Sequence, residues 1–446
     1  MRDFIVLAIV LGAAPVCLLS PYFGVLMWYW VTYMNPHRFT WGFAYDFPVA
    51  VAVAVPTLAG MLFARKSMRS LAVRESLLLL VLWVWFAYTY IHAQGVPLFT
   101  GNMADAAYEM SHISKILLMT FVMIVLITTR ERLRGVVLVT AGSFGLLAIK
   151  STLFGLRTQG ESRVWGPPDS FLSDNNAFGL ALNMSLPLLF FLAREEKNRW
   201  MKLSLRLAFA CTILVVLLTY SRGGLLGLAV VLMTILFKTQ KKFLGAMALV
   251  LAAFLVLSFA PDSWMARMGH FSKGNLDASA EQRLVSWGTA WNFAQDYPIT
   301  GGSFDVLPNV DVFQSYQPRP LPLGYPSSGP HSIYFQLLAD QGFVGLGLFL
   351  LLIASCFWSL SNIRSSARFV PSADYLVQYT HMIEVSILAF MVSGAFLGFV
   401  YLDVIYQMIG ITVVLKSLFL RELEARITSM QEEERMIVPE ELNTFA

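Results

Sequence analysis

The sequence predicts an all-α, polytopic membrane protein with about twelve transmembrane helices and one large polar loop between residues 261 and 331. The composition supports this class, because 57% of the 446 residues are hydrophobic and only 13% are charged, against roughly 25% charged residues in soluble domains. The mean hydropathy is +0.63. These values exclude most soluble folds, and a net charge of only +4 gives no reason to expect nucleic-acid binding.

Apolar segments that meet or nearly meet the length of a membrane span, about 17–25 residues, recur along the chain. The first is interrupted by Pro15 and Pro21, and it is compatible with a span followed by an interfacial aromatic helix from Tyr22 to Tyr33. The segments are 4–33, 47–64, 76–93, 113–129, 135–149, 177–193, 205–220, 223–237, 243–260, 342–360, 382–400 and 403–420. The predicted parts are a membrane part over 1–260 (helices 1–9), the large loop 261–331, a membrane part over 332–420 (helices 10–12) and a tail over 421–446.

Lysine and arginine gather in five of the connections between these segments, which are 65–74, 130–134, 194–206, 238–242 and 364–368. With twelve spans, all five fall on one side, which the positive-inside rule assigns to the cytoplasm. Both termini are then expected in the cytoplasm. The alternating connections face the opposite side, and they are 34–46, 94–112, 150–176, 221–222 and 261–331.

The two ends of the chain and its cysteines suggest no additional chemistry. Cys17, Cys211 and Cys356 all lie inside apolar segments, so we expect neither a disulfide framework nor a cysteine metal site. No polar cleavage region follows the N-terminal apolar run, which we therefore expect to be retained as a helix. The tail has mixed charge and predicts a short cytoplasmic helix.

The large loop 261–331 is rich in Trp, Tyr and Phe, which is unusual for a linker. Loops of this length are commonly functional, and we expect this one to lie against the mouth of the helical bundle as a lid or active-site loop. Within it, Leu284, Trp287 and Trp291 recur at helical spacing next to Arg283. This pattern predicts an amphipathic helix on the membrane surface, with a simple interfacial anchor as the alternative role.

Arg222 stands between two apolar segments with almost no loop, in the sequence TYSRGG over residues 219–224. A guanidinium near the membrane costs free energy unless it is paired or reaches the interface. One interpretation is an arginine that reaches the interface from a tight helical turn. The other is an anion site for a lipid phosphate, which the neighbouring glycines favour because they permit close approach of a ligand.

Arg163 lies in the polar, turn-rich connection 150–176 and is a second candidate for ligand contact. Asp174, Asn175 and Asn176 end this connection, and such a run is a typical N-cap for the helix that follows. We therefore expect Asp174 to cap or orient rather than to catalyse.

His331 follows Pro330 and precedes a helical pattern, which places it at a helix start where the large loop meets the membrane part. The positive end of a helix favours a neutral imidazole, and a neutral imidazole suits a general base. A structural histidine is the alternative. Among the other histidines, His270 is the closest rival, His37 and His112 lack an obvious set of cations, and His92 and His381 lie at span ends.

The order of these pieces resembles the O-antigen ligase/O-antigen polymerase superfamily of bacterial membrane glycosyltransferases. The matching pieces are TYSRGG at 219–224, the run from Arg283 through Trp287, Pro298 and Gly301-Gly302 to Phe304, HSIY at 331–334, GFVGL at 342–346, and Asp174-Asn175-Asn176. MNPHR at 34–38 with TWG at 40–42 is similar to a subfamily of exosortase-associated O-glycosylation ligases. Ser332 departs from the superfamily, in which many members carry Asn after the histidine.

The resemblance implies a GT-C-like helical fold in the bacterial inner membrane, a periplasmic active site and a transferase of lipopolysaccharide biosynthesis. The donor would be a glycan on undecaprenyl diphosphate, and the acceptor of a ligase would be a lipid A-core sugar. In O-antigen or exopolysaccharide polymerases the acceptor is instead a second lipid-linked glycan, and in protein O-oligosaccharyltransferases it is Ser or Thr.

A mechanism follows as a hypothesis from the residue types. A diphosphate leaving group needs its growing negative charge stabilised, and the outward loops offer arginines rather than a carboxylate cage for a divalent metal. We expect Arg222 and Arg283, with Arg163, to bind the diphosphate, and His331 to take the proton of the acceptor hydroxyl. The reaction would then be metal-independent, without a cofactor, and inverting.

A transporter of lipid-linked glycans is the alternative from another class. It would place ionisable groups near the middle of the spans and break corresponding helices in its two halves. Here the unusual charges gather at the outward face next to one large loop, which favours an enzyme.

Overall fold

The structure is a computed structural model, and it describes residues 1–63, 71–239, 247 and 278–437. Throughout these ranges every regular element is a helix, which confirms the all-α class. Nine of the described helices are long and apolar enough to cross a membrane, and Val49–Phe63 is a shorter apolar helix. The chain is a polytopic membrane protein.

The helices follow the chain in the order α1 (Arg2–Leu19), α2 (Pro21–Met34), η1 (Pro36–Phe39), α3 (Val49–Phe63), α4 (Arg74–Ala93), η3 (Pro97–Asn102), α5 (Met103–Leu126), α6 (Arg130–Arg157), α7 (Asn175–Glu195), α8 (Arg199–Leu218), α9 (Arg222–Lys238), α12 (Ala278–Asp296), α13 (Val310–Tyr316), η5 (Pro322–Gly324), α14 (Ile333–Ala367), η6 (Pro371–Ala373), α15 (Asp374–Gly394) and α16 (Asp403–Ile437).

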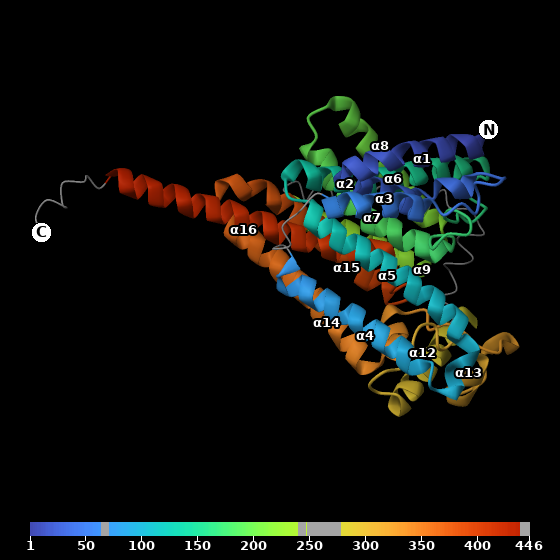
Figure 1. The fold of residues 1–446 in the computed structure, drawn as a ribbon. Helices are drawn as coiled ribbons and strands as arrows, with labels where there is room; N and C mark the ends of the chain where they lie inside the picture. The colour runs from blue at the N-terminus through green and yellow to red at the C-terminus, as the bar shows by residue number, and fades with distance from the viewer. Residues whose placement is uncertain (64–70, 240–246, 248–277, 438–446) are drawn as a thin grey trace, which may run out of the picture.

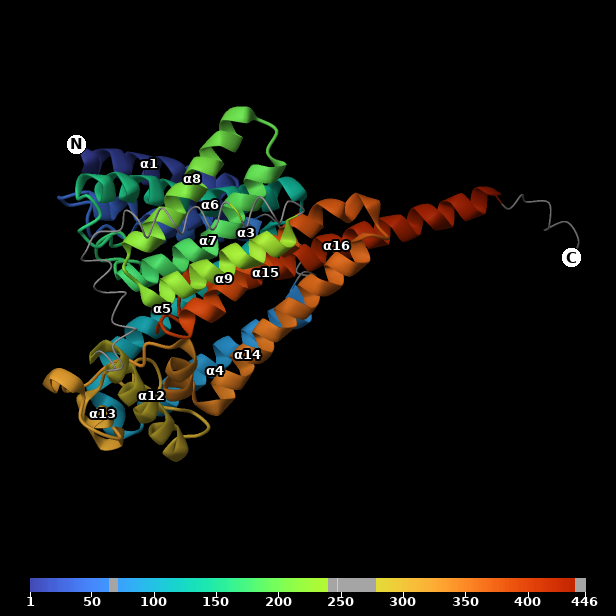
Figure 2. The ribbon, with the colours of Figure 1, turned by 180° about the vertical axis from the view of Figure 1, so that it is seen from behind.

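The helix α7 lies at the centre of the bundle, packed against α6, α8, α9 and α15, and nearly all of its side chains are buried. The helix α9 runs along α15, and α4 runs along α14 (Figures 1 and 2). The helices α12 and α13 lie at the same end as the N-terminus, whereas α16 extends away from the opposite end (Figure 1).

The first apolar run forms a hairpin of two helices rather than one span. The helix α1 ends at Leu19, and Pro21 begins α2 after the single residue Ser20. Asp3 Oδ1 at the start of α1 accepts hydrogen bonds from the backbone amides of Gly42 (3.0 Å) and Ala44 (3.1 Å), which follow α2. Because the start of α1 meets the chain beyond the end of α2, the two helices are antiparallel.

The start of α1 and the end of α16 at Ile437 therefore lie at opposite ends of the bundle, which argues against the expectation that both termini share one side. The physical reason is Pro21, which cannot continue α1 but suits the first position of a new helix. At the turn between the two helices, the Tyr22 hydroxyl donates to the Arg132 carbonyl oxygen (3.3 Å), in one of the basic connections. The helix α16 returns to this same end, where Arg421 donates to the Thr128 carbonyl oxygen (3.0 Å).

The described parts of the five basic connections meet at one end of the bundle, which we call the basic end. Arg134 pairs with Glu196 and so joins the second connection to the third. Glu384 pairs with both Lys238 and Arg364 and so joins the fourth to the fifth. The grouping of basic residues that the sequence predicts is thus present as a physical cluster.

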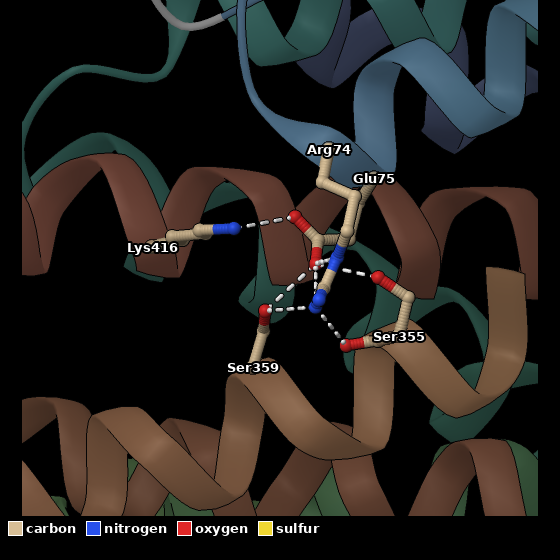
Figure 3. A network of polar contacts seen from close by, with 5 residues as sticks. All are labelled: Arg74, Glu75, Ser355, Ser359 and Lys416. Carbon is tan, nitrogen blue, oxygen red and sulfur yellow. Dashed lines mark hydrogen bonds and ion pairs between the residues drawn. The ribbon is translucent and has the colours of Figure 1, made fainter.

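A buried carboxylate fastens three helices together near the basic end (Figure 3). The side chain of Glu75 in α4 is fully buried and accepts hydrogen bonds from Ser355 and Ser359 of α14 (2.7 Å each) and from Lys416 of α16 (2.9 Å). Arg74 donates to the same carboxylate (2.8 Å). A buried charge needs such a complete set of partners, so this cluster fixes how α4, α14 and α16 pack.

The opposite end carries the described parts of the connections 34–46, 94–102, 158–174, 219–221, 278–331 and 395–402, and we call it the loop end. The large loop has a small core of its own there, formed by Val285, Phe293, Val306, Phe313 and neighbouring apolar residues. Asn102 from η3 donates to the Phe304 carbonyl oxygen (3.0 Å). The described part of the loop is therefore a packed layer over the bundle.

The helix α14 is broken at Gly342, and the large loop binds to the break. Gly342 has φ 68° and ψ −175°, a conformation that is essentially restricted to glycine. The amides of Gly302 and Ser303 donate to the Ala339 and Asp340 carbonyl oxygens (3.0 and 2.8 Å), and the Phe343 amide donates to Pro298 (2.8 Å). The loop thus supplies partners for the backbone groups that the interrupted helix leaves open.

Candidate functional site

His331 lies at the loop end, where the large loop enters α14. It has a left-handed backbone conformation (φ 46°), and the helix begins two residues later at Ile333. Trp287 of α12 donates its indole N–H to the Pro330 carbonyl oxygen (2.8 Å), and Gln282 donates to the Ser328 hydroxyl (2.8 Å). These two contacts from α12 fix the segment that presents His331.

Arg283 and Asp174 flank His331 with opposite charges. The His331 side chain is exposed to solvent but has much protein around it, and this partial burial lowers its pKa below the usual 6.5. The Arg283 guanidinium lowers the pKa further, and the Asp174 carboxylate raises it. The expected neutral imidazole is thus supported, but burial and Arg283 cause it rather than the end of a helix.

Arg222 begins α9 directly after a tight reversal of the chain, as the sequence predicts. The helix α8 ends at Leu218, and the Ser221 hydroxyl caps α9 by accepting the Gly224 amide (3.0 Å). A Cβ atom on Gly223 would lie 3.2 Å from Leu397 Cγ in the turn 395–402. The reversal that carries Arg222 is therefore packed against that turn.

The same turn also contacts His331. A Cβ atom on Gly398 would lie 3.3 Å from the His331 backbone nitrogen and 3.4 Å from its Cα. Gln336, one turn into α14, accepts a hydrogen bond from the Val400 amide (3.2 Å). The Arg222 reversal thus packs on Leu397 and His331 packs on Gly398, so both contact the turn 395–402.

The glycines beside Arg222 serve helix packing. A Cβ atom on Gly227 would lie 1.7 Å from Ser393 Oγ of α15, and Gly224 contacts its own capping residue Ser221. A ligand was expected to approach these glycines closely, but the close contact is instead made within the protein, between α9 and α15.

Arg163 lies in a connection that is bound to the Arg222 reversal. The Val164 amide donates to the Leu218 carbonyl oxygen (3.0 Å), and the Tyr220 hydroxyl donates to Gly160 (2.6 Å). The Arg163 guanidinium lies 5.5 Å from the centre of the Trp165 ring. Arg163 is therefore at the loop end, in a segment attached to Leu218 and Tyr220, which lie four and two residues before Arg222.

Asp174 caps α7, as expected, and its neighbour ties the cap to the same reversal. Asp174 Oδ1 accepts the amides of Asn176 (2.8 Å) and Ala177 (3.2 Å). Asn175 donates its side-chain amide to the Thr219 carbonyl oxygen (2.8 Å). Because Asp174 also influences the His331 pKa, this cap connects the Arg222 reversal with the histidine.

The four residues singled out from the sequence thus lie at one end of the molecule, on segments that contact one another. His331 interacts electrostatically with Arg283, while Arg222 and Arg163 are joined to His331 through the turn 395–402 and the cap at Asp174. Such an arrangement can bind an anion with guanidinium groups next to a base that is neutral at pH 7.

The helix around Arg283 is present as α12, although its faces differ from the expectation. Leu284 and Trp291 are exposed, but Trp287 stacks on Phe335 of α14 with ring centres 5.2 Å apart. Val285 and Phe293 are buried on the other side of the helix. The helix therefore packs on α14 and keeps only part of its apolar surface exposed.

The sequence did not reveal two groups of contacts. Trp287 and Gln336 position the segment around His331, and only the aromatic content of the loop and the spacing of Gln336 after His331 hinted at them. His37 and His112 were expected to lack cations, yet they line one cavity together with Arg38 and Lys115. This expectation is corrected: Arg38 directly follows His37 and Lys115 lies one helical turn after His112, and the cavity brings these two local pairs together.

Two further expectations remain predictions, namely that His270 is the closest rival of His331 and that transfer needs no metal ion. His270 lies outside the described residues. Across the described ranges, no three His, Cys, Asp or Glu side chains gather in a way that could hold a metal ion, and metal-independent transfer remains to be tested.

Comparison with known protein families divides the chain into two parts. Residues 207–350 match a family described as O-antigen ligase, and residues 1–197 match a family of unknown function, DUF5935. None of the curated proteins matches the chain. Arg222, Arg283 and His331 all fall within the first match. Residues 207–350 therefore carry the O-antigen ligase domain, which supports membership of the O-antigen ligase superfamily.

Proposed function

We propose that this protein is an inner-membrane glycosyltransferase that moves a glycan from undecaprenyl diphosphate to a lipid A-core acceptor at the periplasmic face. Membership of the superfamily supports glycan transfer of the ligase or polymerase type. The observation that carries the finer proposal is the proximity of His331 to Arg283 and Asp174 beside the Arg222 reversal. The basic end, opposite this group, would face the cytoplasm.

In the proposed reaction the acceptor hydroxyl oxygen attacks the anomeric carbon of the donor sugar. The bond between that carbon and the diphosphate oxygen breaks, and undecaprenyl diphosphate leaves with the bonding electrons. His331 takes the hydroxyl proton and later releases it to water. A single displacement of this kind inverts the configuration at the anomeric carbon.

The arginines stabilise the charge that develops on the leaving group. Arg222 and Arg283 offer planar, permanently charged donors that suit phosphate oxygens, and Arg163 adds a third on the adjoining connection. The negative charge of Asp174 stabilises the imidazolium that forms on His331, because it favours the protonated form.

A transfer assay in proteoliposomes tests these roles. We expect His331→Ala to lower the rate by about 10²–10⁴ and Arg222→Ala or Arg283→Ala by about 10²–10³. His92→Ala and Arg157→Ala are matched controls, because both are exposed residues at the loop end outside the candidate group, and they should stay near the wild-type rate. Near-normal transfer by correctly inserted His331→Ala would remove the base assignment.

The same assay separates the acceptors. A ligase should form product only when lipid A-core is supplied, a polymerase should lengthen the lipid-linked glycan without it, and a protein glycosyltransferase should label a Ser- or Thr-containing peptide. Full activity after treatment with a chelator is expected for metal-independent transfer, and a loss restored by a divalent cation would contradict it.

A further inference from the structure

A cavity of about 290 Å³ lies at the loop end, between α2, the start of α3, α5 and the segment 169–172. It is close to the candidate site in the fold but formed by other residues. Asp169 to Leu172 line it, and two residues later Asp174 faces His331. Asp403 also lines it, at the end of the turn 395–402 that contacts His331.

Three residues that line this cavity each have a buried polar atom without a hydrogen-bond partner within the described protein. These atoms are Thr32 Oγ1, His37 Nδ1 and His112 Nε2. Buried polar atoms are nearly always hydrogen-bonded, and leaving one unpaired costs about 1–3 kcal/mol. Three such atoms around one cavity therefore indicate a polar ligand.

The charges around the cavity are mixed, which argues against an anionic ligand. Arg38 pairs with Asp46 (3.0 Å), and Lys115 is opposed by Asp169 and Asp403 in the same lining. His37 adds no positive charge at pH 7, because burial and the nearby Arg38 lower its pKa to about 4. A phosphate in this cavity would meet three carboxylates.

The donors and acceptors suit a ligand with many hydroxyl groups. A neutral imidazole has one donor and one acceptor nitrogen, and a hydroxyl can satisfy either. His112 Nε2 and Asp403 Oδ1 are 4.0 Å apart, too far for a direct hydrogen bond, and one hydroxyl placed between them would contact both. Phe171 stacks on His112 with ring centres 3.4 Å apart and gives this wall a flat apolar component.

The cavity is built almost wholly from residues 1–197, the part outside the O-antigen ligase match. The transfer chemistry resides in the matched part, whereas the acceptor is what separates ligases, polymerases and protein glycosyltransferases. The reacting sugar of the donor is linked directly to the diphosphate, so it has to lie beside the arginines. This leaves the cavity to the acceptor. We therefore propose that this cavity binds a sugar residue of the acceptor glycan.

The proposal rests on the proposed function, and kinetics with two varied substrates test it. His112→Phe keeps the ring that stacks on Phe171 but removes both nitrogens, and Thr32→Val removes one hydroxyl. Each should raise the KM for the acceptor roughly three- to tenfold, with kcat and the KM for the donor unchanged. His92→Phe is the matched control at the loop end and should change none of these values.

Other outcomes would overturn the proposal. A rise in the donor KM would assign the cavity to the donor glycan, and unchanged constants in both variants would remove it as a substrate site. Binding of deacylated lipid A-core oligosaccharide to the full chain in nanodiscs, followed by saturation-transfer NMR, is independent of turnover. Binding that is kept by His331→Ala and weakened by His112→Phe supports the proposal even where transfer fails, and no binding by the wild type contradicts it.

Discussion

His331 shows how two distant residues adjust one side chain. Arg283 lies on α12 and Asp174 caps α7, and their charges act on the imidazole in opposite directions. Because the lowered pKa keeps His331 neutral at pH 7, the group is available as a base without any change of protonation state before the reaction.

The pH dependence of transfer tests this adjustment. Protonation removes the base, so the rate should fall only as the pH drops below 6.5, the usual pKa of histidine. Arg283→Gln removes a charge that lowers the pKa and should move the acidic limb to higher pH. Asp174→Asn removes a charge that raises it and should move the limb to lower pH, while Asn still caps α7.

These two shifts should be measured as pH–rate profiles at saturating substrate. The sign of each shift is separate from any loss of rate, so it distinguishes an electrostatic effect from a damaged fold. Profiles that move in the same direction for both variants would contradict the arrangement.

At the scale of single elements, the break in α14 is the feature with the clearest sequence requirement. Gly342 combines positive φ with a backbone contact, because a Cβ atom there would lie 2.2 Å from the Ile299 carbonyl oxygen. Gly347 lies in the same helix with nothing within 4 Å of its Cβ position. The two glycines therefore form a matched pair.

Gly342→Ala should destabilise the protein by at least about 2–3 kcal/mol, since strain of this kind alone costs about 1–3 kcal/mol and the clash adds to it. Gly347→Ala should be neutral or stabilise the helix by about 0.5–1 kcal/mol. The temperature at which each variant unfolds in detergent, read by tryptophan fluorescence, compares them. Equal unfolding temperatures would show that the break is not required.

The contacts of Glu75 give a second prediction at this scale (Figure 3). Glu75→Gln leaves Lys416 and Arg74 facing an uncharged side chain, and removing one member of a buried pair costs about 3–5 kcal/mol. Both cations are partly exposed, so we expect the low end of this range. Adding Lys416→Met to Glu75→Gln should recover part of the loss in unfolding temperature, and a further drop would contradict the pairing.

At the scale of the whole molecule, the hairpin of α1 and α2 places the start of α1 and the end of α16 at opposite ends of the bundle. In the proposed orientation the basic end faces the cytoplasm, so we expect α1 to begin on the periplasmic side and α16 to end in the cytoplasm. The native residues Cys17, Cys211 and Cys356 are buried. A cysteine added at either terminus can therefore be detected above a low background.

A membrane-impermeant maleimide applied to spheroplasts should label a cysteine placed before Met1 but not one placed after Ala446. Permeabilised cells should show both labelled. A cysteine at Lys197, in a basic connection, is the control for the cytoplasmic side. Equal protection of both termini in intact spheroplasts would restore the arrangement that the apolar runs alone suggested.

The sequence predicted those features that depend on neighbouring residues. The Asp174 cap, the reversal before Arg222 and the helix around Arg283 all follow from residue order, and each is present. The grouping of His331 with Arg283 required the resemblance to a known family, because 48 positions separate the two residues along the chain.

Other features depend on contacts that no local pattern records. The positive φ of Gly342 is coupled to the docking of residues 298–303 on the broken helix. The split of the first run into α1 and α2 is supported by Asp3 binding the segment after α2. The cavity beside His112 assembles only when α2, α5 and Asp403 come together.

The docking of the large loop on α14 has a mechanical consequence. Residues 333–341 carry His331 at one end, and at the other end their carbonyl groups hold Gly302 and Ser303. The short half-helix, the histidine and the loop backbone are therefore one connected unit that ends at the break at Gly342. If the proposed function holds, we expect a substrate that displaces one part of this unit to shift His331 and the overlying loop together.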